Sequence, residues 1–487
     1  MTNTSDLITS LQVLGNRIPK VDLDCSEALT KLVVVRVVPD KRVVSQCVWQ
    51  QSVVFAKFFL GSKSRYYAER DKRGASALAS AGILTPALLS VQKLTSSDVS
   101  VLIYQAVEDA LNAEQAYESF SAVERQSLIN RLVKTIAHHH RAGLIQTDCY
   151  LKNFLIKENK IYTLDGDGVR QSTKLSQHKM LGNLSALLSK IDVLDLESWC
   201  SSLLFSYKAV NYLPQLNEGI IKRLVNKHRT RATSRFADQK VFRQCTDVNI
   251  MSSKNTFIAV SSHYSALVLP TTASQLDECF TQTNIIKDGN TCTVALVSIA
   301  PLRVVIKRYN VKNSWHGVSR AFRQTRASAS WANAHRLSLL GLATAKPVAL
   351  IETRTLGVNR EAYFLTEYVD APDTAVFFKQ TTDSALRAQA VKHLVELFYR
   401  LYLLNISHGD TKASNIKVLS DGKPLLIDLD SMRQHRYDFF AKKVHARDIK
   451  RFMQNWKDTP SLYNAFVTAF KVVYVDHAPL QAAQILE

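Results

Sequence analysis

Apolar and polar residues follow one pattern in the first half of the chain. The apolar runs KLVVVRVV and SVVFAKFFL, separated by the turn at residues 39–40, predict two strands. Residues 66–81 predict a helix that ends at Gly82, and VSVLIYQAV predicts a further strand. Residues 126–141 place their apolar side chains on one helical face. We therefore expect a small sheet followed by amphipathic helices.

The second half repeats this order of elements. Apolar strands come first, followed by a long helix at 319–340, the strand AYFLTEYV and a helix at 386–404. A repeated order of elements in a long chain is the signature of internal duplication. The pattern predicts an α+β fold in each half.

Polar landmarks recur in the two halves at nearly constant spacing. Each half has an apolar strand that ends in lysine, then a D-x-x-x-x-N motif, then a strand that ends in D-x-D. These landmarks are Lys57, Asp148, Asn153 and Asp165 in the first half, and Lys307, Asp410, Asn415 and Asp428 in the second. We expect a first domain at 21–215, a basic linker or helix at 216–249 and a second domain at 250–487.

Composition limits the class of partner and the compartment. The 487 residues include 62 Lys and Arg against 42 Asp and Glu, and the net charge of +20 favours an anionic partner such as nucleic acid, a phosphorylated metabolite or a membrane surface. Seven scattered cysteines without C-x-x-C argue against disulfides or zinc and suit a reducing compartment. No signal peptide is evident, and no apolar run approaches the roughly 20 residues of a membrane span. We expect a cytoplasmic protein whose membrane contact is peripheral.

The repeated landmarks match the needs of phosphoryl transfer, which depends on positioning and charge neutralisation. A strand lysine can hold the phosphates of ATP, a loop Asp can accept the proton of the acceptor hydroxyl, and the Asn and the next Asp can hold Mg²⁺. The predicted roles are catalytic for Asp148, Asp410 and Lys412, nucleotide-binding for Lys57 and Lys307, and metal-binding for Asn153, Asp165, Asn415 and Asp428. The second acids, Asp167 and Asp430, would complete a second metal site. Asp448 would brace the second loop from the helix that follows.

Two stretches, QTDCYLKNFLI with TLDGD and ISHGDTKASNI with LIDLD, resemble the bacterial lipopolysaccharide kinase family. The resemblance covers residues 30–200 and 280–460. It implies two protein-kinase-like domains in tandem, each with a small β-rich lobe and a helical lobe, which use ATP and Mg²⁺. It also implies a heptose or Kdo sugar of the lipopolysaccharide inner core as the acceptor, presented at the cytoplasmic face of the inner membrane. In such a fold, Tyr368 and Val369, like Ala106 and Val107 in the first half, would line the hinge near adenine.

The first half departs from the family pattern in its loop, and the second half in its helix. Gln146, Thr147 and Tyr150 replace the His, Gly and Lys that surround Asp410 in the second half. Residues 311–351 contain no Asp or Glu, so Lys307 lacks the helix acid that usually pairs with a kinase lysine. The first half offers Glu69 and Asp71 for this role, and we assign Glu69 to the nucleotide site.

These departures leave several alternatives open. Neither half has G-x-G-x-x-G, and the second offers only residues 287–291 as a turn over the phosphates. The second half keeps the complete loop, so we expect it to be the better catalyst, and it stays open whether one of the two domains is inactive. The alternatives are a tandem pseudokinase or scaffold in envelope biosynthesis, or a kinase that acts on protein or another small molecule. Arg320, Arg323 and Arg326 either grip a phosphate of the acceptor or face water. No nucleic acid is expected, because aromatic and basic residues do not interleave.

Overall fold

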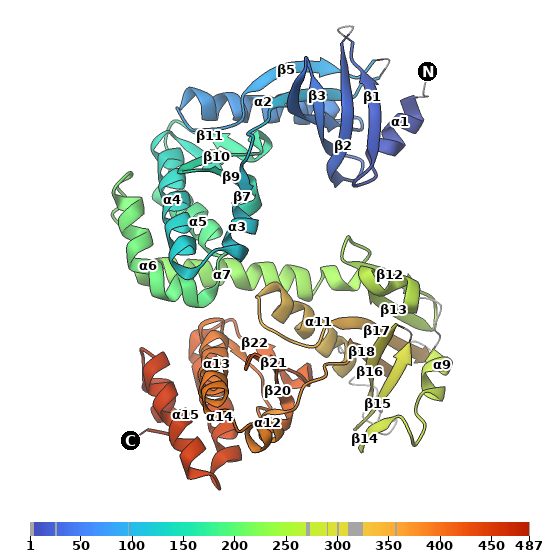
Figure 1. The fold of residues 1–487 in the computed structure, drawn as a ribbon, viewed down its shortest axis with the longest axis vertical. Coiled ribbons are helices and arrows are strands. Elements are labelled where there is room, and N and C mark those ends of the chain that lie inside the picture. The colour runs from blue at the N-terminus through green and yellow to red at the C-terminus, as the bar shows by residue number, and fades with distance from the viewer. Residues whose placement is uncertain are drawn as a thin grey trace. The chain divides into compact units, whose positions relative to one another are not determined.

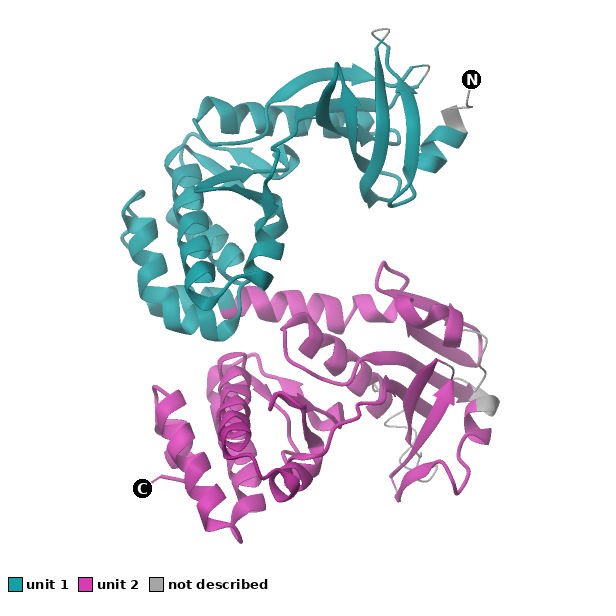
Figure 2. Cartoon of the chain, viewed as in Figure 1, with its two compact units in different colours: residues 1–225 teal, residues 226–487 magenta. Residues whose placement is uncertain are grey.

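The computed structural model describes residues 4–24, 27–95, 97–268, 273–289, 291–299, 301–309, 325–355 and 358–486. The chain divides into two compact units, residues 1–225 and 226–487 (Figure 2). The boundary lies inside helix α7 (Glu218–Ala237). It therefore falls within 216–249, where the sequence predicted a basic linker or helix.

The first unit begins with an antiparallel six-stranded sheet in the order β1-β2-β3-β4-β6-β5 (Figure 1). Its elements are α1 (Thr4–Leu11), β1 (Arg17–Asp22), β2 (Ala28–Val38), β3 (Arg42–Trp49), β4 (Ser52–Phe59), α2 (Ser64–Ser80), β5 (Leu88–Lys93) and β6 (Ser100–Gln105). Along β4, Val54, Ala56 and Phe58 are buried in the core of the sheet. Because side chains alternate along a strand, Phe55 and Lys57 lie on the opposite face.

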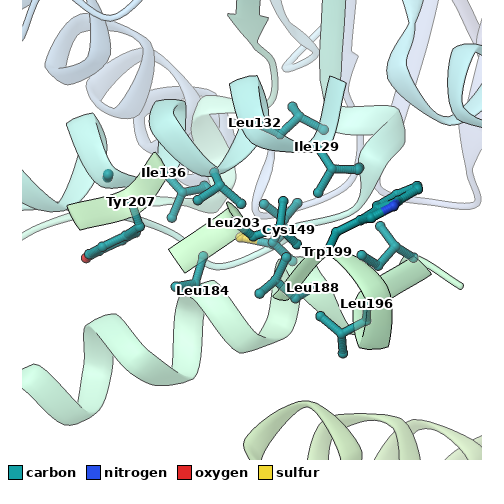
Figure 3. Packing of buried hydrophobic residues seen from close by; sticks show 14 of the residues in the cluster. Ile129, Leu132, Ile136, Cys149, Leu184, Leu188, Leu196, Trp199, Leu203 and Tyr207 are labelled. Atoms are coloured by element: carbon teal, nitrogen blue, oxygen red, sulfur yellow. The ribbon is translucent and has the colours of Figure 1, made fainter. Parts of the chain in front are cut away.

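The remainder of the first unit is mainly helical. Its helices are α3 (Ala113–Ser119), α4 (Ala122–Arg141), α5 (Gln177–Leu188), α6 (Val193–Lys208) and the start of α7. Its short strands are β7 (Leu111–Asn112), β8 (Leu144–Gln146), β9 (Phe154–Lys157), β10 (Lys160–Thr163) and β11 (Val169–Gln171). Ser121 and Glu124 form a capping box that starts α4. The apolar face of α4, including Ile129, Leu132 and Ile136, is fully buried against α5 and α6 (Figure 3).

The second unit has a seven-stranded sheet in the order β12-β13-β17-β18-β16-β15-β14. Its strands are β12 (Val248–Ser252), β13 (Thr256–Ser261), β14 (Ile285–Gly289), β15 (Cys292–Ile299), β16 (Leu302–Tyr309), β17 (Pro347–Thr355) and β18 (Val358–Glu367), with helices α8 (Ser265–Val268), α9 (Ala273–Glu278) and α11 (Arg326–Leu339). The helical part contains α12 (Thr374–Gln380), α13 (Ser384–Leu403), α14 (Asp438–Met453), α15 (Pro460–Val473) and α16 (Ala478–Ala482). Short strands β19 (Ile406–Ser407), β20 (Ile416–Val418), β21 (Pro424–Leu426) and β22 (Arg433–Gln434) lie around the loops.

The predicted elements and the observed ones agree closely where both are described. The predicted helices at 66–81, 126–141 and 386–404 correspond to α2, α4 and α13. The helix predicted at 319–340 is described only from Arg326, where Thr325 caps it by accepting a hydrogen bond from the Ser328 N–H. Residues 319–324 lie outside the described part of the chain. Within that part, no helix combines the length and apolar character that crossing a bilayer requires.

Candidate active site

A cavity of about 610 Å³ lies between the sheet and the helical part of the second unit. Predicted site residues from several elements line it, namely Lys307, Tyr368, Val369, Lys412, Asn415 and Asp428. Val294, Val305 and Phe364 contribute apolar walls. The β14–β15 hairpin brings Lys287 and Cys292 to the same cavity. Of the turn predicted at residues 287–291, Asn290 lies outside the described residues.

Lys307 reaches this cavity because of its place on β16. Val304 and Ile306 are buried in the core of the sheet, so the alternation of the strand directs Lys307 to the opposite face. Its Nζ lies 2.5 Å from Asp428 Oδ1 and 3.5 Å from Asp430 Oδ2. Burial disfavours the charge of Lys307, but Tyr309 and these two carboxylates outweigh it and raise the lysine pKa. Burial likewise opposes ionisation of Asp428, but Lys307 lowers the Asp428 pKa below its usual range.

The missing helix acid of the second unit is replaced by these D-x-D carboxylates. Helices α2 and α11 both end before a glycine of positive φ, Gly82 and Gly341. When the two helices are aligned on these glycines, Asp71 in α2 corresponds to Ser330 in α11, because each lies eleven residues before its glycine. The Ser330 hydroxyl is hydrogen-bonded to Tyr309 and carries no charge. Lys307 therefore takes both of its carboxylate partners from the loop, not from the helix.

The loop after α13 is organised around the carboxylate of Asp410. Asn415 Nδ2 donates to the Asp410 backbone oxygen and to Oδ2, each at 2.9 Å. Lys412 Nζ lies 3.0 Å from the same Oδ2. The Asp410 side chain remains 34% exposed, so a hydroxyl from solvent can reach it. Asp410, Lys412 and Asn415, three of the predicted residues, are thus brought together.

Asp448 of α14 braces this loop, as the sequence predicted. Its carboxylate accepts hydrogen bonds from the backbone N–H groups of His408 (2.7 Å) and Gly409 (3.0 Å). Burial outweighs these two bonds and raises the pKa of Asp448 to about 6. Burial also lowers the pKa of His408, whose Nε2 lies 3.0 Å from the carbonyl oxygen of Ile427. Because a carbonyl only accepts, the neutral imidazole donates from this nitrogen.

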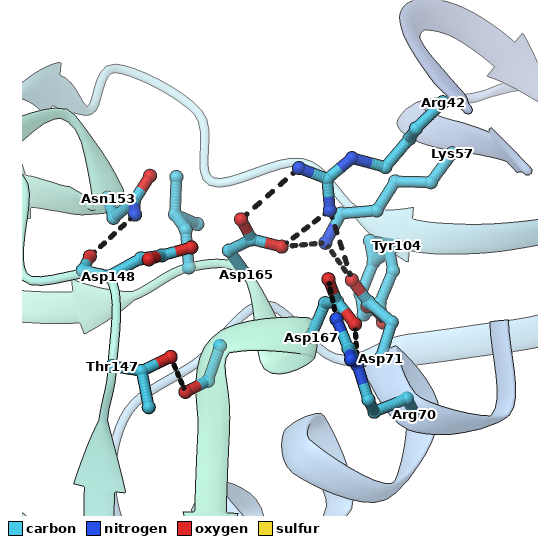
Figure 4. Close-up of polar contacts among 12 residues, drawn as sticks. Arg42, Lys57, Arg70, Asp71, Tyr104, Thr147, Asp148, Asn153, Asp165 and Asp167 are labelled. Atoms are coloured by element: carbon cyan, nitrogen blue, oxygen red, sulfur yellow. Dashed lines mark hydrogen bonds and ion pairs between the residues drawn. The ribbon is translucent and has the colours of Figure 1, made fainter. Parts of the chain in front are cut away.

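The first unit contains a second polar cluster at the corresponding place (Figure 4). Lys57 Nζ lies 2.8 Å from Asp71 Oδ2, and Asp71 is fully buried and also accepts from the Tyr104 hydroxyl. Arg42 holds both oxygens of Asp165, with Nη1 to Oδ1 at 2.7 Å and Nη2 to Oδ2 at 3.3 Å. Burial of Asp165 favours the neutral acid, but Lys57 and Arg42 outweigh it and lower its pKa to about 2.

The helix acid that meets Lys57 is Asp71, which corrects the assignment of Glu69. Glu69 is 44% exposed and lies 4.0 Å from Lys72 on the surface of α2. Helix α2 packs so closely on the D-x-D turn that a Cβ at Gly74 would collide with the backbone of Gly166. This contact sets the rotation of α2 and directs Asp71, not Glu69, toward the lysine.

The loop that carries Asp148 in the first unit keeps part of the structure of the Asp410 loop, but with different residues. Gln146 Nε2 donates to the carbonyl oxygen of Leu164 at 3.0 Å, the bond that His408 makes in the second unit. Asn153 Nδ2 donates to the backbone oxygen of Asp148 at 2.8 Å. Among the described residues, however, nothing pairs with the Asp148 carboxylate. The first loop is thus supported, but its candidate base is not positioned.

A family model described as the lipopolysaccharide kinase (Kdo/WaaP) family matches residues 63–196 and 279–474, more than half of the chain. The chain belongs to this family. No curated protein matches it. The two matched regions confirm the predicted arrangement of two protein-kinase-like α+β domains in tandem.

Two aspartates at equivalent places in the two units have an unusual backbone conformation. Asp165 has φ 64° and ψ 71°, and Asp428 has φ 61° and ψ 62°, both in the left-handed region. Each begins a short 3₁₀ turn that carries the second acid of D-x-D. That acid pairs with an arginine in both units: Asp167 with Arg70 of α2, and Asp430 with Arg326 of α11. The metal-binding role of Asp167 and Asp430 remains a prediction.

Oxygen donors in the second unit suit the Mg²⁺ that is typical of kinases. Asn415 and Asp428 line one cavity with Lys307. The Asn415 nitrogen donates to Asp410, so its amide oxygen would be left to bind the metal ion, and Asp428 Oδ2 would supply a second oxygen. Among the described residues, no group of three or more His, Cys, Asp or Glu side chains is arranged to hold a metal ion. A kinase site does not require one, because phosphates and water complete the coordination.

The remaining predicted residues have mixed outcomes, and two residues that were not predicted also contribute to the sites. Val107 lines a cavity of about 290 Å³ in the first unit with Lys57, Asn153 and Asp165, whereas Ala106 is not part of its lining. Arg320 and Arg323 lie outside the described residues. Arg42 was not predicted, because its only signal in the sequence is its place two residues after the turn at residues 39–40. Asn183 of α5, whose amide donates to the backbone oxygen of Gln146 at 2.7 Å, was not predicted either.

Proposed function

We propose that the second unit transfers the terminal phosphoryl group of ATP to a hydroxyl of a heptose or Kdo sugar in the lipopolysaccharide inner core. The observation that carries this proposal is the position of the Asp410 carboxylate. Asn415 and Lys412 hold it beside a cavity that also contains Lys307 and Asp428. Family membership supports the reaction class and the acceptor class.

Each residue has a role that follows from its contacts. Asp410 orients the acceptor hydroxyl and accepts its proton, and Lys412 offsets the negative charge that develops on the transferring group. Lys307 exchanges its contact with Asp428 for the α- and β-phosphates. Asn415 and Asp428 would hold Mg²⁺, which neutralises phosphate charge when bound. Tyr368 and Val369 border the apolar end of the cavity, where adenine fits.

The first unit, in this proposal, does not transfer phosphate. The Asp148 carboxylate has no positioning contact among the described residues, and Tyr150 stands where the second unit has Lys412. The Tyr150 side chain is 44% exposed. Without an oriented base and the neighbouring ammonium, the loop lacks two of the contributions to catalysis described above.

We also propose that the second unit contacts an anionic membrane surface through exposed aromatic residues. Tyr437, Phe439 and Phe440 at the start of α14 are exposed, Phe439 by 73%. Lys442 lies 4.0 Å from Asp476, which places this segment beside exposed Val475. Cations flank these aromatic residues in the sequence, namely Arg436, Lys442 and Lys443. Apolar side chains among cations suit a surface of anionic lipid, and such contact would bring the kinase to a lipid-linked acceptor.

The decisive experiment is transfer from radiolabelled ATP to dephosphorylated inner-core oligosaccharide in the presence of Mg²⁺. We expect Asp410→Asn to lower transfer by about 10²- to 10⁴-fold and Asp148→Asn to leave it within about twofold. Transfer that depends on Asp148 instead would reverse the assignment of units. Transfer to protein or to a small molecule, but not to core sugar, would identify another acceptor. No transfer to any of them would favour the pseudokinase or scaffold alternative.

A further inference from the structure

Arg42 gives the first unit a permanent cation at the place where a kinase would hold its metal. The guanidinium binds both oxygens of Asp165 and lies 3.8 Å from Asp71 (Figure 4). The Arg42 side chain is 13% exposed and lines the cavity of the unit. A guanidinium stays charged at every pH that a protein tolerates, so this cation cannot leave by deprotonation.

The second unit has a neutral residue at the matching position. Lys57 faces Val44 on the neighbouring strand, and Lys307 faces Val294. Two residues before these valines lie Arg42 and Cys292, each at the start of its strand. Cys292 is buried and lines the cavity of the second unit. The hairpin therefore inserts a cation in one unit and a thiol in the other.

The first site does not fit Mg²⁺ as the second one does. Mg²⁺ takes oxygen ligands, and both carboxylate oxygens of Asp165 already accept from Arg42. The second acid, Asp167, is held by Arg70 through Nε and Nη2. A metal at Asp165 would have to displace a mostly buried, bidentate ion pair, which is among the strong contacts in proteins.

The same cavity is suited to phosphate without a metal. Four cations line it, Arg36, Arg42, Lys57 and Lys152, with Asp165 as the single acid in the lining. Val35, Val44, Phe55 and Leu155 supply apolar walls. Its volume of about 290 Å³ is less than half of the 610 Å³ in the second unit, where a nucleotide and an acceptor must meet.

We infer that the first unit binds a nucleoside polyphosphate without a divalent metal, and that Arg42 supplies the positive charge that Mg²⁺ supplies in the second unit. The apolar walls take the base, and the phosphates meet the guanidinium and the lysines. Such a site retains nucleotide but transfers nothing, in contrast to the second unit.

Photolabelling of the full chain with 8-azido-ATP, followed by peptide mapping, tests this inference with and without EDTA. We expect the peptides around the first cavity to be labelled equally in both conditions. Labelling of the second unit should fall by about 10- to 100-fold in EDTA, because the phosphates lose their counter-charge. Arg42→Cys, which installs the residue of the second unit, should make labelling of the first unit equally sensitive to EDTA. Arg65→Cys, at an exposed position of α2, is the matched control and should change nothing.

Three results would overturn the inference: an unlabelled first unit, loss of its label in EDTA in the wild type, or a label in Arg42→Cys that still resists EDTA. If Arg42→Cys does not fold, the wild-type comparison decides alone. Labelling is measured without an acceptor. Its result therefore does not depend on the transfer assay, and the inference can stand or fail whatever Asp410→Asn does to transfer.

Discussion

Replacement of Asp448 by Asn separates the charge of this residue from its shape. In the wild type, the buried carboxylate accepts from the N–H groups of His408 and Gly409. The Asn side chain keeps one acceptor oxygen and cannot ionise. One of the two N–H groups therefore loses its partner, and the loop that carries Asp410 loses part of its support.

The magnitude follows from the pKa of Asp448, which rises from 3.8 to about 6 on folding. Between these two values the folded protein retains a proton that the unfolded chain has released, so protonation stabilises the fold, and this contribution is fully present below about pH 4. That contribution, about 3 kcal/mol, is lost as the pH rises through 6. Asn does not titrate, so the free energy of unfolding of the variant should gain about 3 kcal/mol relative to wild type between pH 4 and pH 7.

The assay pairs denaturant unfolding at pH 4 and pH 7 with transfer rates from pH 5 to pH 8. Wild-type transfer should fall below pH 6 as Asp448 is protonated. Transfer by Asp448→Asn should be about 10- to 100-fold lower at pH 7.5, because a small displacement of the catalytic group is costly, and should lack that acidic limb. Equal stability differences at both pH values, or wild-type transfer by the variant, would refute the role of Asp448 as an ionised brace.

Three further outcomes test packing, charge and surface contact. Gly74→Ala should destabilise the first unit by about 1–3 kcal/mol in urea unfolding, because the new methyl group meets the D-x-D turn. Gly182→Ala, at an open helical position, should stabilise it by about 0.5–1 kcal/mol. Asp71→Ala should lower the free energy of unfolding by about 3–5 kcal/mol, since its buried ion pair is broken. Phe439→Ser should weaken binding to phosphatidylglycerol vesicles by at least about tenfold, whereas Phe205→Ser, at an equally exposed aromatic of the first unit, should not.

Much of the fold was predictable because its signals are local. The strand that carries Lys57 is a nearly continuous apolar run, and the helix before Asp148 has one apolar face, so both elements are specified by neighbouring residues. The order of landmarks also placed Lys307 and Asp428 in one cavity. Strands β12 and β13, by contrast, join the second sheet through β17, a long-range pairing that no local pattern specifies.

The charged partners within each site were less predictable because they depend on rotation and register. Glu69 and Asp71 are both acids of one helix, and only the close packing at Gly74 decides which one meets the lysine. Arg42 sits at the start of a strand, and its partner Asp165 is 123 residues away. In the sequence, Gln146 appeared to be the loss of a loop histidine. Its amide nevertheless donates to a backbone oxygen in the same way as His408 does in the second unit.

The left-handed backbone at Asp165 and Asp428 limits what evolution can place there. Asp, Asn and Gly tolerate this conformation far better than other residues do. A unit that has ceased to transfer phosphate would therefore still tend to retain Asp at this position, held by the geometry of the turn alone. The presence of D-x-D is thus weak evidence that a unit is active. The hairpin residue at the matching position, arginine or cysteine, distinguishes an inactive unit from an active one better.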